Sequence, residues 1–158
     1  MKYKYINSPV GKLKLVVEHN SLVAILWENE RLNRVKLDEM TESNDDKLLL
    51  NVEKQLNEYF QGKRKNFDLP LKASGTPFQE KVWQLLKDIP HGVTCSYKDI
   101  AVKMDHSKAV RAVGAAVGRN PISIIIPCHR VIGTNGSLTG FAGGLDRKKI
   151  LLEVENIL

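Results

Sequence analysis

The stretch "NPISIIIPCHRVIG", residues 120–133, is the part of the sequence that most constrains the fold. Its isoleucine-rich run predicts a buried strand, and Pro127 ends that strand because proline has no N–H group to donate to a sheet. A thiol, an imidazole and a guanidinium follow at Cys128, His129 and Arg130. Functional groups often lie where a strand meets a loop, so we expect Cys128 to belong to a functional site.

The reactivity of Cys128 depends on its neighbours. Positive charge on His129 and Arg130 is expected to lower the pKa of the thiol and to favour the thiolate. Direct contact between Cys128 and His129 is sterically awkward, because adjacent side chains of an extended chain point to opposite sides. We therefore expect a bridging water molecule, through which His129 removes the thiol proton. Cys95 has no such setting and is expected to be a small apolar residue of the core.

The C-terminal segment "DRKKILLEVENIL", residues 146–158, offers a carboxylate that would orient this imidazole. Glu155 lies three or four residues from Leu151, Leu152 and Leu158, which on a helix places it beside an apolar stripe. A carboxylate in that position needs a partner. Two partners remain open from the sequence: His129, or an arginine in a buried ion pair.

Composition and charge limit the class of protein. Apolar residues make up 42% of the 158 residues, a balance typical of globular domains, and no apolar run reaches the roughly 20 residues that span a bilayer. We expect a soluble cytoplasmic protein with no membrane partner and no metal, because its cysteines and histidines lack the paired spacings of zinc sites. The formal charge of +6 falls mostly on residues 75–158, which favours a nucleic acid as partner.

Residues 1–74 predict an α/β domain. "KLKLVV" (12–17) alternates as a half-buried strand does, and "SLVAILW" (21–27) is a second strand after a turn. A helix over 45–62 is expected to begin at aspartates and to end at Gly62. Its buried stripe is expected to consist of Leu48, Leu49, Val52, Leu56, Tyr59 and Phe60.

Residues 75–158 predict a mostly helical domain. Its first helix is expected to begin at Thr76 as N-cap, with Pro77 at the first helical position and Gln79 completing a capping box. Pro90 and Gly92 are expected to stop this helix. Its core-facing stripe is expected to consist of Phe78, Val82, Leu85, Leu86 and Ile89.

Two short helices follow, one over 97–104 with Ser96 as its cap and one over 108–118 with Ser107 as its cap. The short connection between them predicts a helix-turn-helix, and an ordinary helical pair in a core is the alternative.

The second of these helices has an apolar face and a face with one long cation and otherwise almost no side chain. The latter surface lets a helix backbone approach a grooved polyanion closely. Small residues also suit close packing between helices, so both interpretations stay open. The apolar face consists of Val110, Val113 and Val117, and the other face of Arg111, Gly114, Ala115 and Gly118.

Four segments taken together point to a family: "SYKDIA" (96–101), "RAVGAA" (111–116), "NPISIIIPCHRVIG" (120–133) and "GFAGGLDRKKILLEVE" (140–155). In content and order they resemble the O6-alkylguanine-DNA alkyltransferases, also called methylated-DNA–protein-cysteine methyltransferases. The resemblance implies a ribonuclease-H-like N-terminal domain with a mainly antiparallel sheet, and a mostly α-helical C-terminal domain with a helix-turn-helix.

The same resemblance implies a function in DNA repair. Such proteins bind the minor groove of double-stranded DNA, flip O6-alkylguanine out of the stack and transfer the alkyl group irreversibly to their own cysteine. Each molecule reacts once, no cofactor is required, and we expect the chain to act as a monomer.

Carried over by motif, Cys128 would be the alkyl acceptor, His129 the water-mediated base and Glu155 the carboxylate that orients it. Asn120 would support the turn that carries the site. Tyr97 would help to rotate the nucleotide out and would offer its hydroxyl to the departing base.

The resemblance also implies residues that contact the substrate. Arg111 would fill the gap left by the flipped nucleotide. Phe141 stands where many relatives have tyrosine, and Ala142 stands where some have serine, so two hydroxyl groups are absent from the pocket. The other DNA-binding residues would be Ser96, Ala112, Gly114 and Ala115, and Val131 would join Phe141 and Ala142 in the substrate pocket.

Three other functions remain as alternatives. A non-catalytic lesion-binding relative would lack the reactive cysteine, whereas Cys128 is present. A helix-turn-helix regulator with a sensor cysteine would prefer a DNA sequence to a lesion. A cysteine hydrolase would turn over many times on an acyl substrate.

Overall fold

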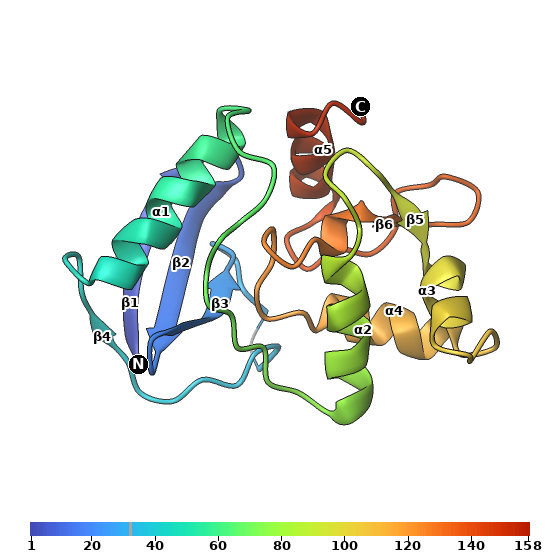
Figure 1. Cartoon of the computed structure of the whole chain (residues 1–158), viewed down its shortest axis with the longest axis horizontal. Coiled ribbons are helices and arrows are strands. Elements are labelled where there is room, and N and C mark those ends of the chain that lie inside the picture. The colour runs from blue at the N-terminus through green and yellow to red at the C-terminus, as the bar shows by residue number, and fades with distance from the viewer. Residues whose placement is uncertain (32) are drawn as a thin grey trace.

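The computed structural model describes residues 1–31 and 33–158. A sheet with one helix beside it forms the N-terminal half, and the other helices gather in the C-terminal half (Figure 1). The sheet consists of β1 (Lys2–Ser8), β2 (Gly11–Glu18), β3 (Ser21–Leu26) and β4 (Thr41–Glu42). The helices are α1 (Lys47–Phe60), α2 (Pro77–Lys87), α3 (Tyr97–Lys103), α4 (Val110–Gly118) and α5 (Leu145–Val154). Two short strands, β5 (Cys95–Ser96) and β6 (Val131–Ile132), and the 3-10 helix η1 (Cys128–Arg130) complete the described elements.

The first sheet has the strand order β3-β2-β1-β4 and is mainly antiparallel, as predicted. β1 pairs with β2 and β2 with β3 in antiparallel fashion, whereas the two residues of β4 run parallel to β1. The strand β1 was not among the predicted strands. Ile6 is the one fully apolar position of this strand that is buried, so its pattern is weak in the sequence.

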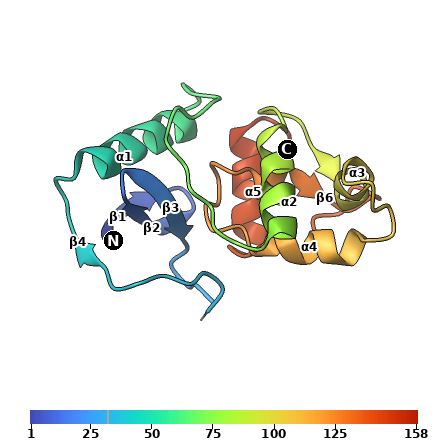
Figure 2. The same cartoon turned by 60° about the horizontal axis from the view of Figure 1, so that its bottom comes forward.

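One large hydrophobic core extends through both halves, beside a smaller cluster of Val16, Ala24 and Leu26. The inner face of the sheet packs against α1, where Leu49, Val52, Leu56 and Tyr59 of the predicted stripe are fully buried. The large core continues into α2, α4 and α5 of the C-terminal half, which lie together on the other side of the connecting segment from the sheet (Figures 1 and 2). None of the helices described is long and apolar enough to cross a membrane.

Backbone hydrogen bonds cover the edge of β3, and one of them joins the two halves. The amide of Leu22 donates to the carbonyl of Pro70 (2.8 Å), and its carbonyl accepts from Lys72 (2.9 Å). Farther along the strand, the amide of Ile25 donates to the carbonyl of Pro121 (2.9 Å). The edge strand is therefore covered by the connection between the halves and by the segment that precedes Cys128.

The predicted caps of α2 and α3 are confirmed. Thr76 and Gln79 form both bonds of a capping box, and Ser96 forms the equivalent box with Asp99. The predicted cap at Ser107 is wrong. The chain turns through a backbone bond from Ala109 to the carbonyl of His106 (2.8 Å), so α4 begins later, without a side-chain cap.

Two further predictions are corrected by the structure. Residues 122–126 are buried but form a tight turn, not a strand: the amide of Ile126 donates to the carbonyl of Ile122 (3.0 Å), and Ile124 has a φ of +76°. A positive φ is rare for a β-branched residue and requires support from the surrounding structure. Leu158 does not join the apolar stripe of α5, because α5 ends at Val154 and Leu158 is 59% exposed.

Candidate active site

Asn120 holds the turn that leads to Cys128. Its amide nitrogen donates to the carbonyl of Ile126 (2.8 Å), and its side-chain oxygen accepts from the amide of Ile122 (3.0 Å). The side chain is buried, so these bonds are not exchanged with water. They support the positive φ of Ile124 and fix where the chain delivers Cys128.

Cys128 opens the 3-10 helix η1 and is buried, with a relative exposure of 4%. Burial raises the pKa of its thiol, although hydrogen bonding from Asn120 and the positive charges of Arg34 and Lys148 act in the opposite direction. The predicted lowering of this pKa by His129 and Arg130 is therefore wrong for the structure described. Burial therefore favours the neutral thiol over the thiolate at this position.

His129 lies beside Glu155 and is fully buried. Its Nε2 atom is 2.6 Å from Oε2 of Glu155. Burial lowers the pKa of the imidazole, against the effect of Glu155. A neutral ring that donates from Nε2 to a carboxylate carries an unprotonated Nδ1. This Nδ1 atom is buried and has no hydrogen-bond partner within residues 1–31 and 33–158.

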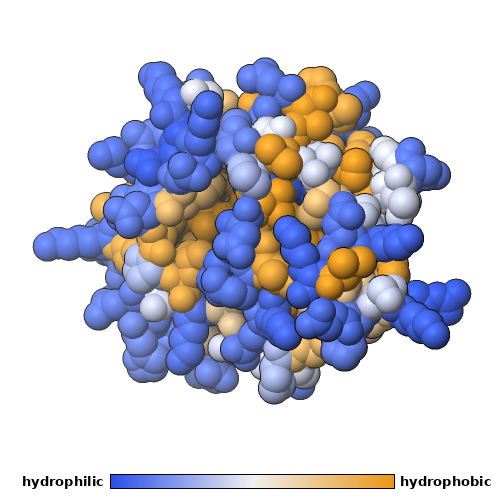
Figure 3. All heavy atoms as spheres, turned by 45° about the vertical axis from the view of Figure 1, so that its right-hand side comes forward, coloured by the Kyte–Doolittle hydropathy of each residue, from blue (hydrophilic) through white to orange (hydrophobic). Residues whose placement is uncertain are grey.

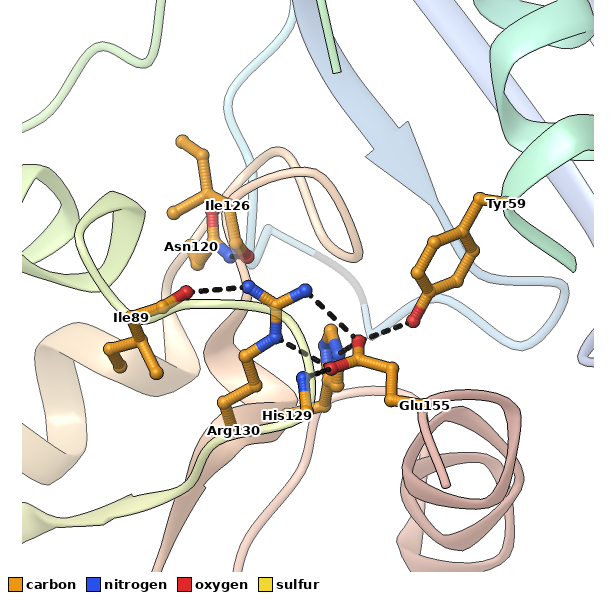
Figure 4. Close-up of polar contacts among 8 residues, drawn as sticks. Tyr59, Ile89, Asn120, Ile126, His129, Arg130 and Glu155 are labelled. Atoms are coloured by element: carbon orange, nitrogen blue, oxygen red, sulfur yellow. Dashed lines mark hydrogen bonds and ion pairs between the residues drawn. The ribbon is translucent and has the colours of Figure 1, made fainter. Parts of the chain in front are cut away.

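Glu155 is the centre of a buried hydrogen-bond network (Figure 4). Arg130 donates from Nε to Oε1 (2.8 Å) and from Nη2 to Oε2 (3.1 Å), and the amide of Gly92 donates to Oε1 (3.0 Å). Both partners left open by the sequence are therefore present, the imidazole and the arginine. Burial alone would raise the pKa of Glu155, but the bonds from His129, Arg130 and Tyr59 outweigh it and hold the pKa well below its usual range.

Three residues at this site were missed by the sequence analysis. Tyr59 donates its hydroxyl to Oε2 of Glu155 (2.5 Å). Lys148 is fully buried and donates to the carbonyls of Val131 (2.7 Å) and Thr139 (3.1 Å). Arg34 pairs with Glu30 and donates to the carbonyl of Asn120 (2.8 Å).

The sequence contains no local signal for these three residues. Tyr59 occupies an apolar position of a helical stripe, and Lys148 and Arg34 stand in charged segments. The bonds that bring them to the site span 17 positions for Lys148–Val131, 86 for Arg34–Asn120 and 96 for Tyr59–Glu155, so only the folded chain reveals them.

A cavity of about 470 Å³ opens between α3, α4 and the loop 139–142. Tyr97 lines it and donates its hydroxyl to the carbonyl of Thr139 (3.1 Å), and Phe141 lines it with its ring edge-on to Trp27 (5.4 Å). Burial raises the pKa of Tyr97, and nearby Cys128 adds to this effect. Arg111, Gly114, Phe141 and Ala142, all predicted site residues, line the same cavity, whereas Val131 is buried in β6 and is not part of the lining.

The outer face of α4 is open. Arg111, Ala112 and Ala115 are exposed, and a Cβ atom added at Gly118 would meet no other atom within 4 Å. A Cβ atom at Gly114 would touch the ring of Tyr97 at 3.9 Å, an ordinary contact. Close helix packing therefore does not explain the small residues, and the interpretation of this face as a surface for an external partner is favoured.

The surface of the molecule on the side that carries α3 is mixed. Figure 3 brings this side forward and shows apolar groups interrupted by many hydrophilic side chains. The exposed cations on and next to α3 and α4 are Lys98, Lys103, Lys108, Arg111 and Arg119.

Comparison with protein families shows two matches that together span the chain. Residues 1–73 match the "6-O-methylguanine DNA methyltransferase, ribonuclease-like domain", and residues 77–157 match the "6-O-methylguanine DNA methyltransferase, DNA binding domain". Two similar curated proteins are the methylated-DNA–protein-cysteine methyltransferase of Methanosarcina mazei, 45% identical, and the constitutive one of Bacillus subtilis, 43% identical. Each alignment covers 98% of this chain, with 97% and 95% of the relatives.

Solved structures show the same relation. The crystal structure of Mycobacterium tuberculosis OGT in complex with DNA is similar with a TM-score of 0.88 and 42% identity, over 98% of this chain and 92% of that one. An O6-methylguanine DNA methyltransferase from Methanococcus jannaschii is similar with a TM-score of 0.69 and 34% identity, over 98% and 94% of the two chains. The likeness therefore includes both halves of the chain.

Proposed function

Because the chain belongs to the 6-O-methylguanine DNA methyltransferase family, we propose that Cys128 is the residue that accepts the alkyl group. The protein is a methylated-DNA–protein-cysteine methyltransferase, which repairs DNA by alkyl transfer to its own cysteine in a single turnover. One observation carries the assignment to Cys128. Its thiol is followed by a buried imidazole whose Nε2 is bonded to Glu155 and whose Nδ1 has no partner among the described residues.

The neutral thiol must lose a proton before it attacks. We propose that one water molecule links Sγ of Cys128 to Nδ1 of His129, so that the proton passes through the water to the imidazole. Glu155 then stabilises the imidazolium through Nε2. Support for this role comes from the network of Arg130 and Gly92, which keeps Glu155 charged.

The thiolate displaces guanine from the alkyl carbon. The S–C bond forms as the C–O6 bond breaks, and the electron pair of the broken bond stays on the guanine. A proton donated to the departing base lowers the barrier, and we propose Tyr97 as the donor. Tyr97 lines the cavity, and its hydroxyl already acts as a hydrogen-bond donor to the carbonyl of Thr139 (3.1 Å), which supports this role.

We propose that α3 and α4 form a helix-turn-helix that enters the minor groove of the DNA. The two helices are consecutive and pack against each other, and the open face of α4 allows close approach to a groove. Ser96, Ala112 and Ala115 would contact the backbone of the duplex, with Gly114 next to the cavity. Exposed cations around these helices supply the attraction to phosphates.

The cavity next to Tyr97 is proposed to receive the flipped base. Arg111, at the rim of this cavity, would fill the gap that the base leaves in the stack. Phe141 would form an apolar wall, and Ala142 would leave its backbone amide to contact O6. Val131 would act from behind the lining, through its carbonyl bond to Lys148.

We further propose that residues 1–74 and 75–158 are the two domains, and that the protein acts as a monomer in the cytoplasm. One chain contains the thiol, the base and the carboxylate, so the chemistry needs no second subunit. Both cysteines are free thiols, as suits a reducing compartment.

The experiment that tests this function compares two cysteine variants with duplex DNA containing O6-[³H-methyl]guanine. Cys128→Ala should transfer no label but still bind the duplex, because the DNA-contacting face of α4 is unchanged. Cys95→Ala is the matched control and should retain transfer. Label transfer by folded Cys128→Ala would contradict the assignment, and repeated turnover on an acyl substrate would instead support a hydrolase.

A further inference from the structure

We propose that Tyr59, from the N-terminal half, is a positioning residue. It holds Glu155 in place and weakens the stabilisation that Glu155 gives to the protonated form of His129. The inference rests on the proposed role of His129 as the base. It assigns to the ribonuclease-like domain a part in the chemistry, because the bonds to Glu155 from His129, Arg130 and Gly92 all come from the C-terminal half.

The contact is direct and buried. Tyr59 lies on α1, is fully buried, and donates its hydroxyl to Oε2 of Glu155 at 2.5 Å. The same oxygen is 2.6 Å from Nε2 of His129. Figure 4 shows the tyrosine reaching the carboxylate from the side opposite Arg130. Tyr59 and His129 therefore share one acceptor atom.

The hydroxyl has little freedom to leave this position. The ring of Tyr59 contacts those of Phe60, Phe67 and His91, with centroids 5.3, 5.5 and 6.1 Å away. Burial, together with the charge of Glu155, raises the pKa of Tyr59 far above its ordinary value, so the hydroxyl remains a donor at all working pH values. The α1 helix thus delivers a permanent hydrogen bond to the carboxylate.

A donor on a carboxylate oxygen withdraws negative charge from it, which weakens the stabilisation of a neighbouring imidazolium. Tyr59 therefore keeps the imidazole of His129 less basic than Glu155 alone would make it. His129 then stays neutral, and able to accept the thiol proton, down to a lower pH. This effect separates Tyr59 from a residue that only fills space.

Other charged groups face the same network. Arg130 contacts Glu155, and Lys148 on α5 acts on His129. Burial lowers the pKa of His91, in the loop after α2, against the effect of Glu155, and the charges of Arg130 and Lys65 add to the lowering. Removal of the Tyr59 hydroxyl changes none of these formal charges, so its effect is separable from theirs.

The test is the pH dependence of the transfer rate to free O6-benzylguanine for the full chain and Tyr59→Phe. We expect the acid limb of the profile to move to higher pH in the variant. At a pH on that limb its rate should be lower by at least about threefold, because the lost bond is made to a charged acceptor, with little change at alkaline pH. Tyr5→Phe, an exposed tyrosine of β1, is the matched control and should leave the profile unchanged.

A ¹⁵N NMR titration of His129 provides a second measurement, independent of transfer. The pKa of His129 should rise in Tyr59→Phe and should not respond to this change in a Glu155→Gln background. An unshifted titration in the folded variant, or an acid limb that stays in place while the rate falls uniformly, would overturn the proposal. Failure of the wild-type chain to react at all would instead count against the role of Cys128, and the titration would still test Tyr59.

Discussion

At the scale of single residues, Glu155 determines the chemical state of the site. Its Oε2 receives bonds from Tyr59, His129 and Arg130, and its Oε1 receives bonds from Arg130 and Gly92. A buried carboxylate is stable as an anion only when its lone pairs are satisfied in this way. The charge of Glu155 is then available to stabilise His129 when that residue takes the thiol proton.

This arrangement predicts acid lability. The folded-state pKa of Glu155 is depressed, so its contribution to stability is present above the unfolded pKa of about 4.3 and is lost as the pH falls below that value. Glu155→Gln should lower the free energy of unfolding at pH 7 by about 3 kcal/mol, since Arg130 loses its buried partner. Thermal unfolding between pH 7 and 3 measures both effects. Parallel curves for wild type and variant over the acid range would contradict the depressed pKa.

At the scale of elements, the caps of α2 and α3 and the turn before Cys128 show what the sequence can and cannot predict. The caps at Thr76 and Ser96 were predicted because their bonds are local. The turn at 122–126 was not, because a short isoleucine run reads equally well as a strand. Its positive φ at Ile124 depends on bonds to Asn120 that form only in the folded chain.

The same reason explains which site residues were found. Cys128, His129 and Glu155 stand in recognisable segments, and the predicted pairing of Glu155 with His129 is present. Tyr59 and Arg34 come from the other half of the chain and reach the site through tertiary packing alone. The prediction of a lowered pKa for Cys128 was wrong for a related reason. The sequence shows the nearby cations, but it does not show the burial that raises this pKa or the bond that holds Arg130 to Glu155.

The open face of α4 gives a prediction at this scale. Ala115→Glu adds a charged side chain to an exposed helical position, so the free energy of unfolding should change by less than about 0.5 kcal/mol. Affinity for duplex DNA should fall at least tenfold, because the carboxylate repels phosphates and blocks close approach. Leu50→Glu, at an exposed position of α1, is the control. Equal affinity of both variants in an electrophoretic mobility shift assay would remove α4 from the interface.

At the scale of the whole molecule, the two halves share one core and a backbone-bonded edge. Ile25 of β3 is bonded to Pro121, and Arg34 is bonded to the carbonyl of Asn120. Both contacts reach the segment that leads to Cys128. The N-terminal half therefore supports the active site directly, in addition to the contact between Tyr59 and Glu155.

A shared core predicts that the halves unfold together. Trp27 and Trp83 are both buried, one in each half, so Trp27→Phe and Trp83→Phe leave a single tryptophan that reports on one half at a time. Each variant should show the same unfolding midpoint by tryptophan fluorescence as by far-ultraviolet circular dichroism. Two separated transitions within one variant would indicate that the halves are energetically independent.

The assignment of Cys128 as acceptor is tested most directly by mapping the label after reaction with duplex DNA that carries O6-[³H-methyl]guanine. Peptide mass spectrometry and scintillation counting should find one methyl group per protein molecule, on the peptide that contains Cys128, and no further transfer when fresh substrate is added. Label on the Cys95 peptide, or removal of more than one methyl group from DNA per protein molecule, would contradict the account.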